Sequence, residues 1–203
     1  MRPIVTCAFV AAAMLALAVA GLGQGQPVDK SKLMKNNPQS PPKEASATIG
    51  GKQLWIVYHA PSVRGRKIFG GADALQPDDT TWRLGADYAT VLHTDGTLDF
   101  NGKTVPPGDY SLYIALDKGK WQLIVNTQTG QWGINMDGST TDNPAKDLVH
   151  IPLTMSKPSA PAEQLKISLT GTGGDKGKLE IAWADVDAAA PFIVRPVLGV
   201  PVK

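Results

Sequence analysis

Regular alternation of apolar and polar residues most limits how this chain can fold. Apolar side chains stand at every second position in three segments, 148–156, 164–170 and 178–184. Because successive side chains of a strand point to opposite faces, each segment is predicted to be a strand with one apolar face. Sheets of this kind must cover that face with a second sheet or close on themselves. The apolar face of the last two strands is predicted to contain Leu165, Ile167, Leu169, Leu179, Ile181 and Trp183.

Turn signals divide the rest of the chain into further short strands. Asn101-Gly102 is the strongest hairpin signal, and glycine-containing turns at 50–52 and 118–120 also separate strand-like segments. The chain has 21 Gly and 16 Pro, which favours many turns over long helices. We find no helical pattern after the first 23 residues. We therefore predict an all-β fold, an antiparallel β-sandwich, with a flattened β-barrel as the alternative.

The first 23 residues have the pattern of a signal peptide. Arg2 supplies a positive charge, an apolar run covers 4–22, and small residues follow in which cleavage is expected after Ala20 or Gly23. The alternative is an uncleaved N-terminal membrane anchor, because the run is close to the length that crosses a bilayer. Export to the periplasm or the cell exterior is thus predicted, with no membrane span after cleavage.

Three further segments follow the predicted signal peptide. Residues 24–44 are rich in Pro and Lys and poor in apolar residues, so we predict a disordered linker. Residues 45–186 contain the strand pattern and form the predicted β-sandwich domain. Residues 187–203 are a C-terminal extension that is predicted to add an edge strand.

Several chemistries are excluded or disfavoured by the sequence. Cys7 is the only cysteine and lies in the predicted signal peptide, so the mature chain has no disulfide or thiolate ligand. His59, His93 and His150 lack metal-ligand spacing, and no Gly-x-Ser-x-Gly motif is present. The net charge of +2 is too balanced to indicate nucleic acid as a partner. We expect no cofactor and no metal, and oligomeric state cannot be read from the sequence.

One cluster of polar and aromatic residues is a candidate site. Three pieces of sequence, 58–71, 81–90 and 131–133, fall at predicted strand ends, where a sandwich gathers its loops. Guanidinium groups suit carboxylates and phosphates, and aromatic rings suit pocket walls. The alternative is structural, with Arg83 paired to Asp87 and the tryptophans in the core. The candidate ligand-binding residues are Tyr58, Arg64, Arg66, Trp82, Arg83, Asp87 and Trp132.

The same stretches resemble a bacterial family, domain-of-unknown-function family 2911. The resemblance covers about Pro38 to Asp185 and implies an exported bacterial protein without an agreed activity. One departure lies at residues 72–81, where the family has a short Pro-Tyr-Gly segment. The motifs that carry it include Arg64-Gly65-Arg66 with Ile68-Phe69-Gly70, Trp82-Arg83 with Gly85-Ala86-Asp87, Pro107-Gly108 and Gln131-Trp132-Gly133.

Three functions are compatible with these features. The preferred one is a noncatalytic binding module for an anionic small molecule or a glycan of the cell envelope. The second is a small hydrolase-like enzyme that uses Asp87 or His59 as a base beside the arginines. The third is a purely structural envelope protein.

Overall fold

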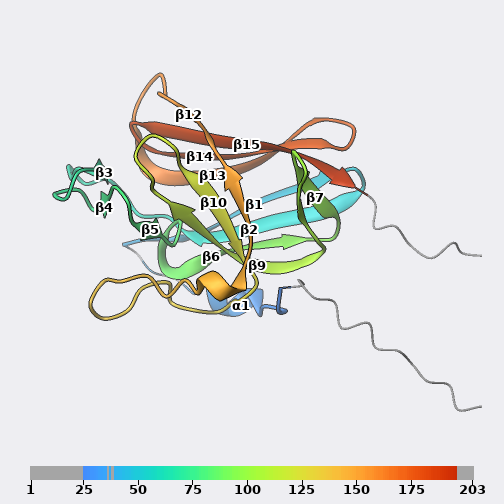
Figure 1. Ribbon diagram of the computed structural model, residues 1–203, viewed down its shortest axis with the longest axis horizontal. Helices are drawn as coiled ribbons and strands as arrows, with labels where there is room; N and C mark the ends of the chain where they lie inside the picture. The colour runs from blue at the N-terminus through green and yellow to red at the C-terminus, as the bar shows by residue number, and fades with distance from the viewer. Residues whose placement is uncertain (1–24, 36, 38, 196–203) are drawn as a thin grey trace, which may run out of the picture.

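Two antiparallel sheets face each other in the computed structural model, which describes residues 25–35, 37 and 39–195. The first sheet has the order β1-β2-β6-β9-β10-β11, and a short strand, β5, also pairs with β9. The second has the order β13-β14-β15-β7-β8, and β12 pairs with β15. Figure 1 shows β13, β14 and β15 of the second sheet, in orange and red, above the blue and green strands β1, β2, β6 and β9 of the first. The predicted sandwich is confirmed, and the alternative of a flattened barrel is wrong because the described strands form two separate sheets.

The strand bounds follow the predicted turns. The hairpin turns at 50–51, 101–102 and 118–120 each join two neighbouring antiparallel strands, as predicted. The first sheet consists of β1 (Pro42–Ile49), β2 (Lys52–His59), β5 (Thr81–Trp82), β6 (Ala86–Thr94), β9 (Gly108–Ala115), β10 (Gln122–Asn126) and β11 (Asp147–Pro152). The second consists of β7 (Thr97–Phe100), β8 (Lys103–Val105), β12 (Thr154–Ser156), β13 (Ala162–Gly173), β14 (Lys176–Ala184) and β15 (Val186–Arg195). A small parallel pair is formed by β3 (Phe69–Gly70) and β4 (Gln76–Pro77).

The main hydrophobic core lies between the two sheets. The predicted inward faces of β13 and β14 are buried, and they pack on apolar residues of β2, β9 and β10. The segment 148–156, predicted as one strand, is two strands in the structure. Its first part, β11, belongs to the first sheet, and β12 crosses to the second. Leu153, between them, is buried in the core.

The chain beyond residue 186 differs from the prediction of an edge strand. β15 lies between β14 and β7, in the interior of the second sheet. Ala188, Ala190, Phe192 and Val194 alternate along it, and each is at most 3% exposed. The alternation therefore continues past the predicted domain boundary, and this strand is part of the core.

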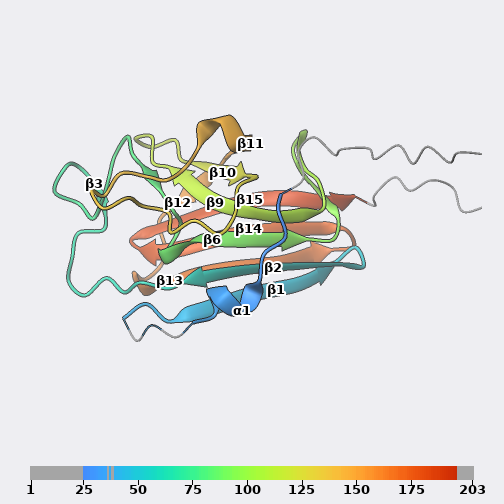
Figure 2. The ribbon, with the colours of Figure 1, turned by 90° about the horizontal axis from the view of Figure 1, so that it is seen from below.

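The predicted disordered linker, 24–44, also differs from the structure in its described part. The described residues within 25–40, which we call the strap, contain a short helix, α1 (Lys30–Leu33), and lie across the outer face of the first sheet (Figure 2). Leu33 is buried against Val57 and Val91, with Val28 packed beside them. Two apolar side chains therefore attach the strap to an apolar cluster on the sheet that the local composition does not reveal.

Other predictions for the ends of the chain lie outside the described residues. The predicted signal peptide, residues 1–23, and the last eight residues, 196–203, are among the segments that the structure does not describe. Within the described ranges, no helix has the length and apolar character needed to cross a membrane.

Candidate functional site

A cleft of about 710 Å³ opens at the end of the sandwich where β2 finishes and β6 begins. This volume falls in the usual range for small-molecule sites. Its walls come from the strap, from the loop after β2, from the segment 75–86 and from the loop 134–140, with Trp183 of β14 also lining it. Both ribbon views show the β3–β4 segment and the loop after β10 projecting from this same end (Figures 1 and 2).

Arg64 and Arg66 reach the cleft from the loop that follows β2. Arg64 and Gly65 both adopt positive φ, 50° and 69°, so the loop turns sharply between the two arginines. Arg66 folds back and donates to the carbonyl oxygens of Ser62 and Val63, at 2.6 and 3.1 Å. These contacts fix the guanidinium group, which remains exposed at the cleft wall.

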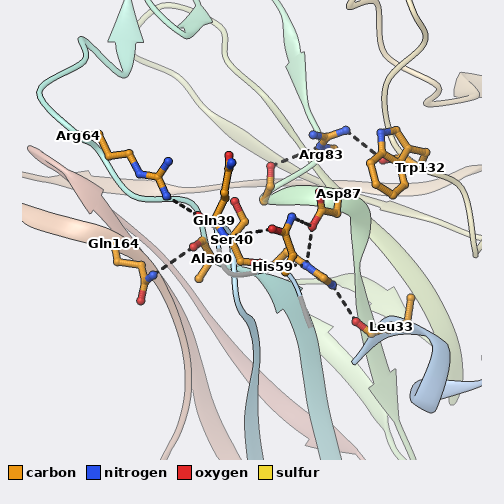
Figure 3. A network of polar contacts seen from close by, with 12 residues as sticks. Leu33, Gln39, Ser40, His59, Ala60, Arg64, Arg83, Asp87, Trp132 and Gln164 are labelled. Carbon is orange, nitrogen blue, oxygen red and sulfur yellow. Dashed lines mark hydrogen bonds and ion pairs between the residues drawn. The ribbon is translucent and has the colours of Figure 1, made fainter. Parts of the chain in front are cut away.

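Arg64 connects this loop to the strap. Its Nη2 donates to the carbonyl oxygen of Gln39 at 3.0 Å, as Figure 3 shows. Gln39 and Ser40 both line the cleft, so the strap supplies part of its wall. The segment predicted as a linker thus contributes to the candidate site.

Arg83 enters the cleft from the other side and is half-buried. Its Nη1 donates to the carbonyl oxygen of Trp132 at 3.1 Å, and its guanidinium lies 5.9 Å from the centre of that indole ring. Burial lowers the pKa of Arg83, and the nearby Asp87 carboxylate opposes that shift. Gly133 makes room for this side chain, since a Cβ there would lie 2.6 Å from Arg83 Cδ.

Two stacked indoles form the inner wall. Trp82 and Trp183 have ring centres 5.4 Å apart and planes 25° apart, and both line the cleft. Phe69 packs edge-on against each of them. Trp82 is 2% exposed, so the structural interpretation, a core residue, holds for most of its surface. Trp183, which sequence reasoning placed on an inward face, was not predicted to be at the site.

Asp87 pairs with His59 instead of Arg83. Nδ1 of His59 lies 2.8 Å from the Asp87 carboxylate, and Asn37 Nδ2 donates to the same oxygen at 2.6 Å (Figure 3). Leu84 and Asp87 both have positive φ, 55° and 58°. The start of β6 is therefore irregular, and the β2–β6 register shifts between Val57 and His59. At this irregularity Asp87 pairs with His59 of β2.

Both ring nitrogens of His59 are engaged. Nδ1 also contacts the carbonyl oxygen of Ser40 at 3.1 Å, and Nε2 contacts that of Leu33 at 2.8 Å. Because these oxygens only accept hydrogen bonds, each contact needs a ring N–H. His59 is 3% exposed and neither residue of the pair lines the cleft. The arrangement ties the strap to β2 and offers no free base to a ligand.

The predicted residues therefore divide into two groups. Arg64, Arg66, Trp82 and Arg83 line one cleft. Of the others, Tyr58 is buried between the sheets, where its hydroxyl oxygen accepts from the Ile167 backbone N–H at 3.1 Å. Burial raises the pKa of Tyr58. Asp87 belongs to the ion pair just described, and Trp132 is 48% exposed and supports Arg83 from outside the cleft.

The loop 134–140 was not predicted to contribute to the site. Ile134, Ser139 and Thr140 line the cleft together with the arginines. Their only sequence signal is a turn-rich polar stretch, which fits many loops equally well. Across the part of the chain that the structure describes, no three His, Cys, Asp or Glu side chains are grouped to hold a metal ion.

These features define a β-sandwich protein with an arginine-lined cleft at one end. A family model described as "Protein of unknown function (DUF2911)" matches residues 40–192, and the chain belongs to this family. The match includes the loops that carry all three cleft arginines. Searches of curated proteins and of solved structures found no match.

Proposed function

We propose that this domain is a noncatalytic binding module for a small anionic ligand, an acidic sugar or a comparable carboxylate or phosphate, held in the cleft. One observation carries this proposal. Every charged side chain on the cleft wall, among the described residues, is an arginine: Arg64, Arg66 and Arg83. Three cations around one cavity repel each other, and an anion relieves that repulsion while accepting paired hydrogen bonds from a guanidinium fork.

The internal partners of the arginines support the same proposal. Each guanidinium group donates to backbone carbonyl oxygens, and among the described residues none of the three forms an ion pair. Carbonyl oxygens orient a guanidinium without neutralising it. Each arginine also has more N–H donors than these contacts use. The cleft therefore has both charge and directed donors left for a ligand.

Catalysis is the weaker alternative. A base needs a free lone pair within hydrogen-bond reach of a bound substrate. His59 uses both ring nitrogens on oxygens, and Oδ2 of Asp87 contacts both His59 and Asn37. Neither lines the cleft.

We further propose that the domain acts outside the cytoplasm, on the strength of the N-terminal pattern. N-terminal sequencing of the mature protein from fractionated cells tests this.

Calorimetric titration of the purified protein with glucuronate tests the binding proposal, with uncharged glucose as the matched control. We expect glucuronate to bind, glucose to bind at least tenfold more weakly, and the affinity for glucuronate to fall as salt is raised from low to high ionic strength. Inorganic phosphate is the second anionic probe. Failure of both anions to bind would overturn the proposal.

Charge-removing variants locate the binding. Arg66→Gln and Arg83→Gln should each weaken glucuronate binding by about tenfold or more, because each removes a charge-assisted hydrogen-bond donor. Lys103→Gln is the control, since Lys103 is an exposed cation on β8 that does not line the cleft. Equal losses in all three variants would mean that net charge, and not this cleft, attracts the anion.

A further inference from the structure

The two stacked indoles of the cleft differ in how their N–H groups are satisfied. Trp82 Nε1 donates to the carbonyl oxygen of Gly85 at 3.2 Å. Trp183 Nε1 is buried and has no hydrogen-bond partner. The two rings share one stack and one apolar neighbour, Phe69. Stacking alone therefore does not explain why Trp183 Nε1 lacks a hydrogen-bond partner. The explanation must lie in what surrounds this nitrogen.

A buried donor without a partner is unusual and needs an explanation. An indole N–H can only donate, so it must find an acceptor to recover the hydrogen bond that it makes with water when unfolded. Trp183 is 1% exposed, and it is one of the residues that line the cleft. A ligand that enters the cleft is the available source of an acceptor.

Apart from the arginines, the side chains that line the cleft are apolar or are neutral polar ones such as Thr81 and Thr140. Pro61, Leu75, Pro77 and Ile134 line the same cavity, and its only charged side chains are the three arginines. Carboxylates and phosphates are matched by the arginines. A second group that accepts from the single neutral N–H is best matched by an uncharged oxygen such as a hydroxyl, ether or carbonyl oxygen, because a second charge would be desolvated there without a cation of its own.

Resting on the anion binding proposed above, we infer that the ligand carries an uncharged oxygen in addition to its anionic group, and that Trp183 Nε1 donates to that oxygen. The ligand class is thus an oxygenated acid, such as a sugar acid, and not a simple hydrophobic carboxylate. Trp183 acts as a specificity-determining residue, because an acid without the second oxygen leaves the N–H unpaired.

Two probes separate this inference from anion binding in general. Glucuronate has a carboxylate on an oxygenated six-membered ring, and cyclohexanecarboxylate has a carboxylate on a ring of similar size without other oxygens. We expect the wild-type protein to bind glucuronate about tenfold more tightly than cyclohexanecarboxylate. Equal affinities would overturn the inference about Trp183 and leave anion binding intact. Binding of neither probe would overturn both.

The variant Trp183→Phe provides the second test. It removes the N–H and keeps an aromatic ring, so the affinity for glucuronate should fall to that for cyclohexanecarboxylate, which itself should change less than twofold. The melting temperature of the free protein reports whether the variant is folded. Unchanged discrimination between the two probes in a folded Trp183→Phe protein would overturn the inference.

Trp82→Phe is the matched control. It removes a satisfied N–H from the neighbouring ring, and the lost contact is to Gly85, whose carbonyl oxygen also accepts from Arg83 Nε at 3.4 Å. Any effect on binding should therefore act through Arg83 and lower the affinities for both probes by the same factor. The inference would be contradicted if Trp82→Phe bound the two probes equally well while Trp183→Phe still preferred glucuronate. That result would mean that Trp82, and not Trp183, recognises the second oxygen.

Discussion

Nδ1 of His59 lies 2.8 Å from the Asp87 carboxylate, in a pair that joins the end of β2 to the start of β6 and holds the strap against both. The His59 side chain is 4% exposed and that of Asp87 18%. Removing the imidazole takes a hydrogen-bond partner from a largely buried carboxylate oxygen, which keeps only its contact with Asn37. Two strap carbonyl oxygens, those of Leu33 and Ser40, would lose their donor at the same time.

We therefore expect His59→Leu to lower the free energy of unfolding by about 1–3 kcal/mol, measured by urea denaturation. The strap should also become sensitive to trypsin at Lys32 and Lys35, because its main polar attachment is lost. His150→Leu is the control: the side chain of His150 is 43% exposed in its pair with Asp147, so its loss should cost about 1 kcal/mol or less. A strap that resists trypsin in His59→Leu would contradict the assigned role.

The close approach of Gly133 to Arg83 gives a second prediction. In Gly133→Ala the new Cβ would lie 2.6 Å from Arg83 Cδ and 2.8 Å from its Cβ, so the arginine must move away from the Trp132 carbonyl oxygen. Binding of glucuronate should weaken about tenfold, measured by calorimetric titration.

Gly130→Ala is the matched control for that variant. Gly130 and Gly133 have similar positive φ, 84° and 93°, so alanine is strained at both positions. A Cβ at Gly130 meets nothing within 4 Å. Backbone strain is thus shared, and only Gly133→Ala displaces Arg83. Equal binding losses in the two variants would show that loop strain, and not the arginine, controls affinity.

Much of the fold was predictable because it depends on local patterns. Alternation predicted the buried faces of β13 and β14, and glycine turns predicted three hairpins. The strap was missed because its attachment depends on two apolar side chains, Val28 and Leu33, that pack on apolar side chains of the distant strands β2 and β6. Whether a segment with few apolar residues is buried depends on the surface that it packs against. That surface comes from distant parts of the chain, so the segment's own sequence does not show it.

The candidate site was predictable in part for a related reason. Arg64, Arg66 and Arg83 were identified by type and by their place at strand ends, and the structure brings them to one cleft. The proposed Arg83–Asp87 pair was wrong because spacing in sequence predicts contact only in regular structure, and Asp87 has a φ of 58°. The N–H of Trp183 is unpaired because no acceptor among the described residues lies near it in the folded protein. No pattern in the sequence reports such an absence.

A third prediction concerns pH. Burial, together with the neighbouring Asp147 carboxylate, raises the pKa of Asp142 from 3.8 to about 6. Folding therefore favours the protonated form, so the stability that this group contributes is greatest below about pH 4 and is lost as pH rises through about 6. Asp142→Asn retains an oxygen that can accept from Asn126 Nδ2, now 3.0 Å from the carboxylate, and carries no charge.

Urea denaturation between pH 4.5 and 7.5 checks this expectation. Asp142→Asn should be more stable than the wild-type protein at pH 7.5, and its stability should depend less on pH across that range. Asp137→Asn, on the same loop, is the control. Hydrogen bonds from Ser139 lower the pKa of Asp137, so its replacement should bring no gain in stability at pH 7.5. A gain from Asp137→Asn equal to that from Asp142→Asn would point to net charge instead.

The final prediction tests the packing between the sheets. A Cβ on Gly177 of β14 would lie 2.5 Å from Phe192 Cζ and 2.8 Å from Ile49 Cδ1, inside the core. Gly177→Ala should therefore lower the free energy of unfolding by about 1–3 kcal/mol, because neighbouring side chains must leave their preferred rotamers. Gly171, its partner on β13, has Ile49 Cγ1 at 3.7 Å, an ordinary contact. Gly171→Ala should thus be neutral or stabilising by about 0.5 kcal/mol through the unfolded state. Reversal of this order in urea denaturation would show that the sheets are not packed at this position as described.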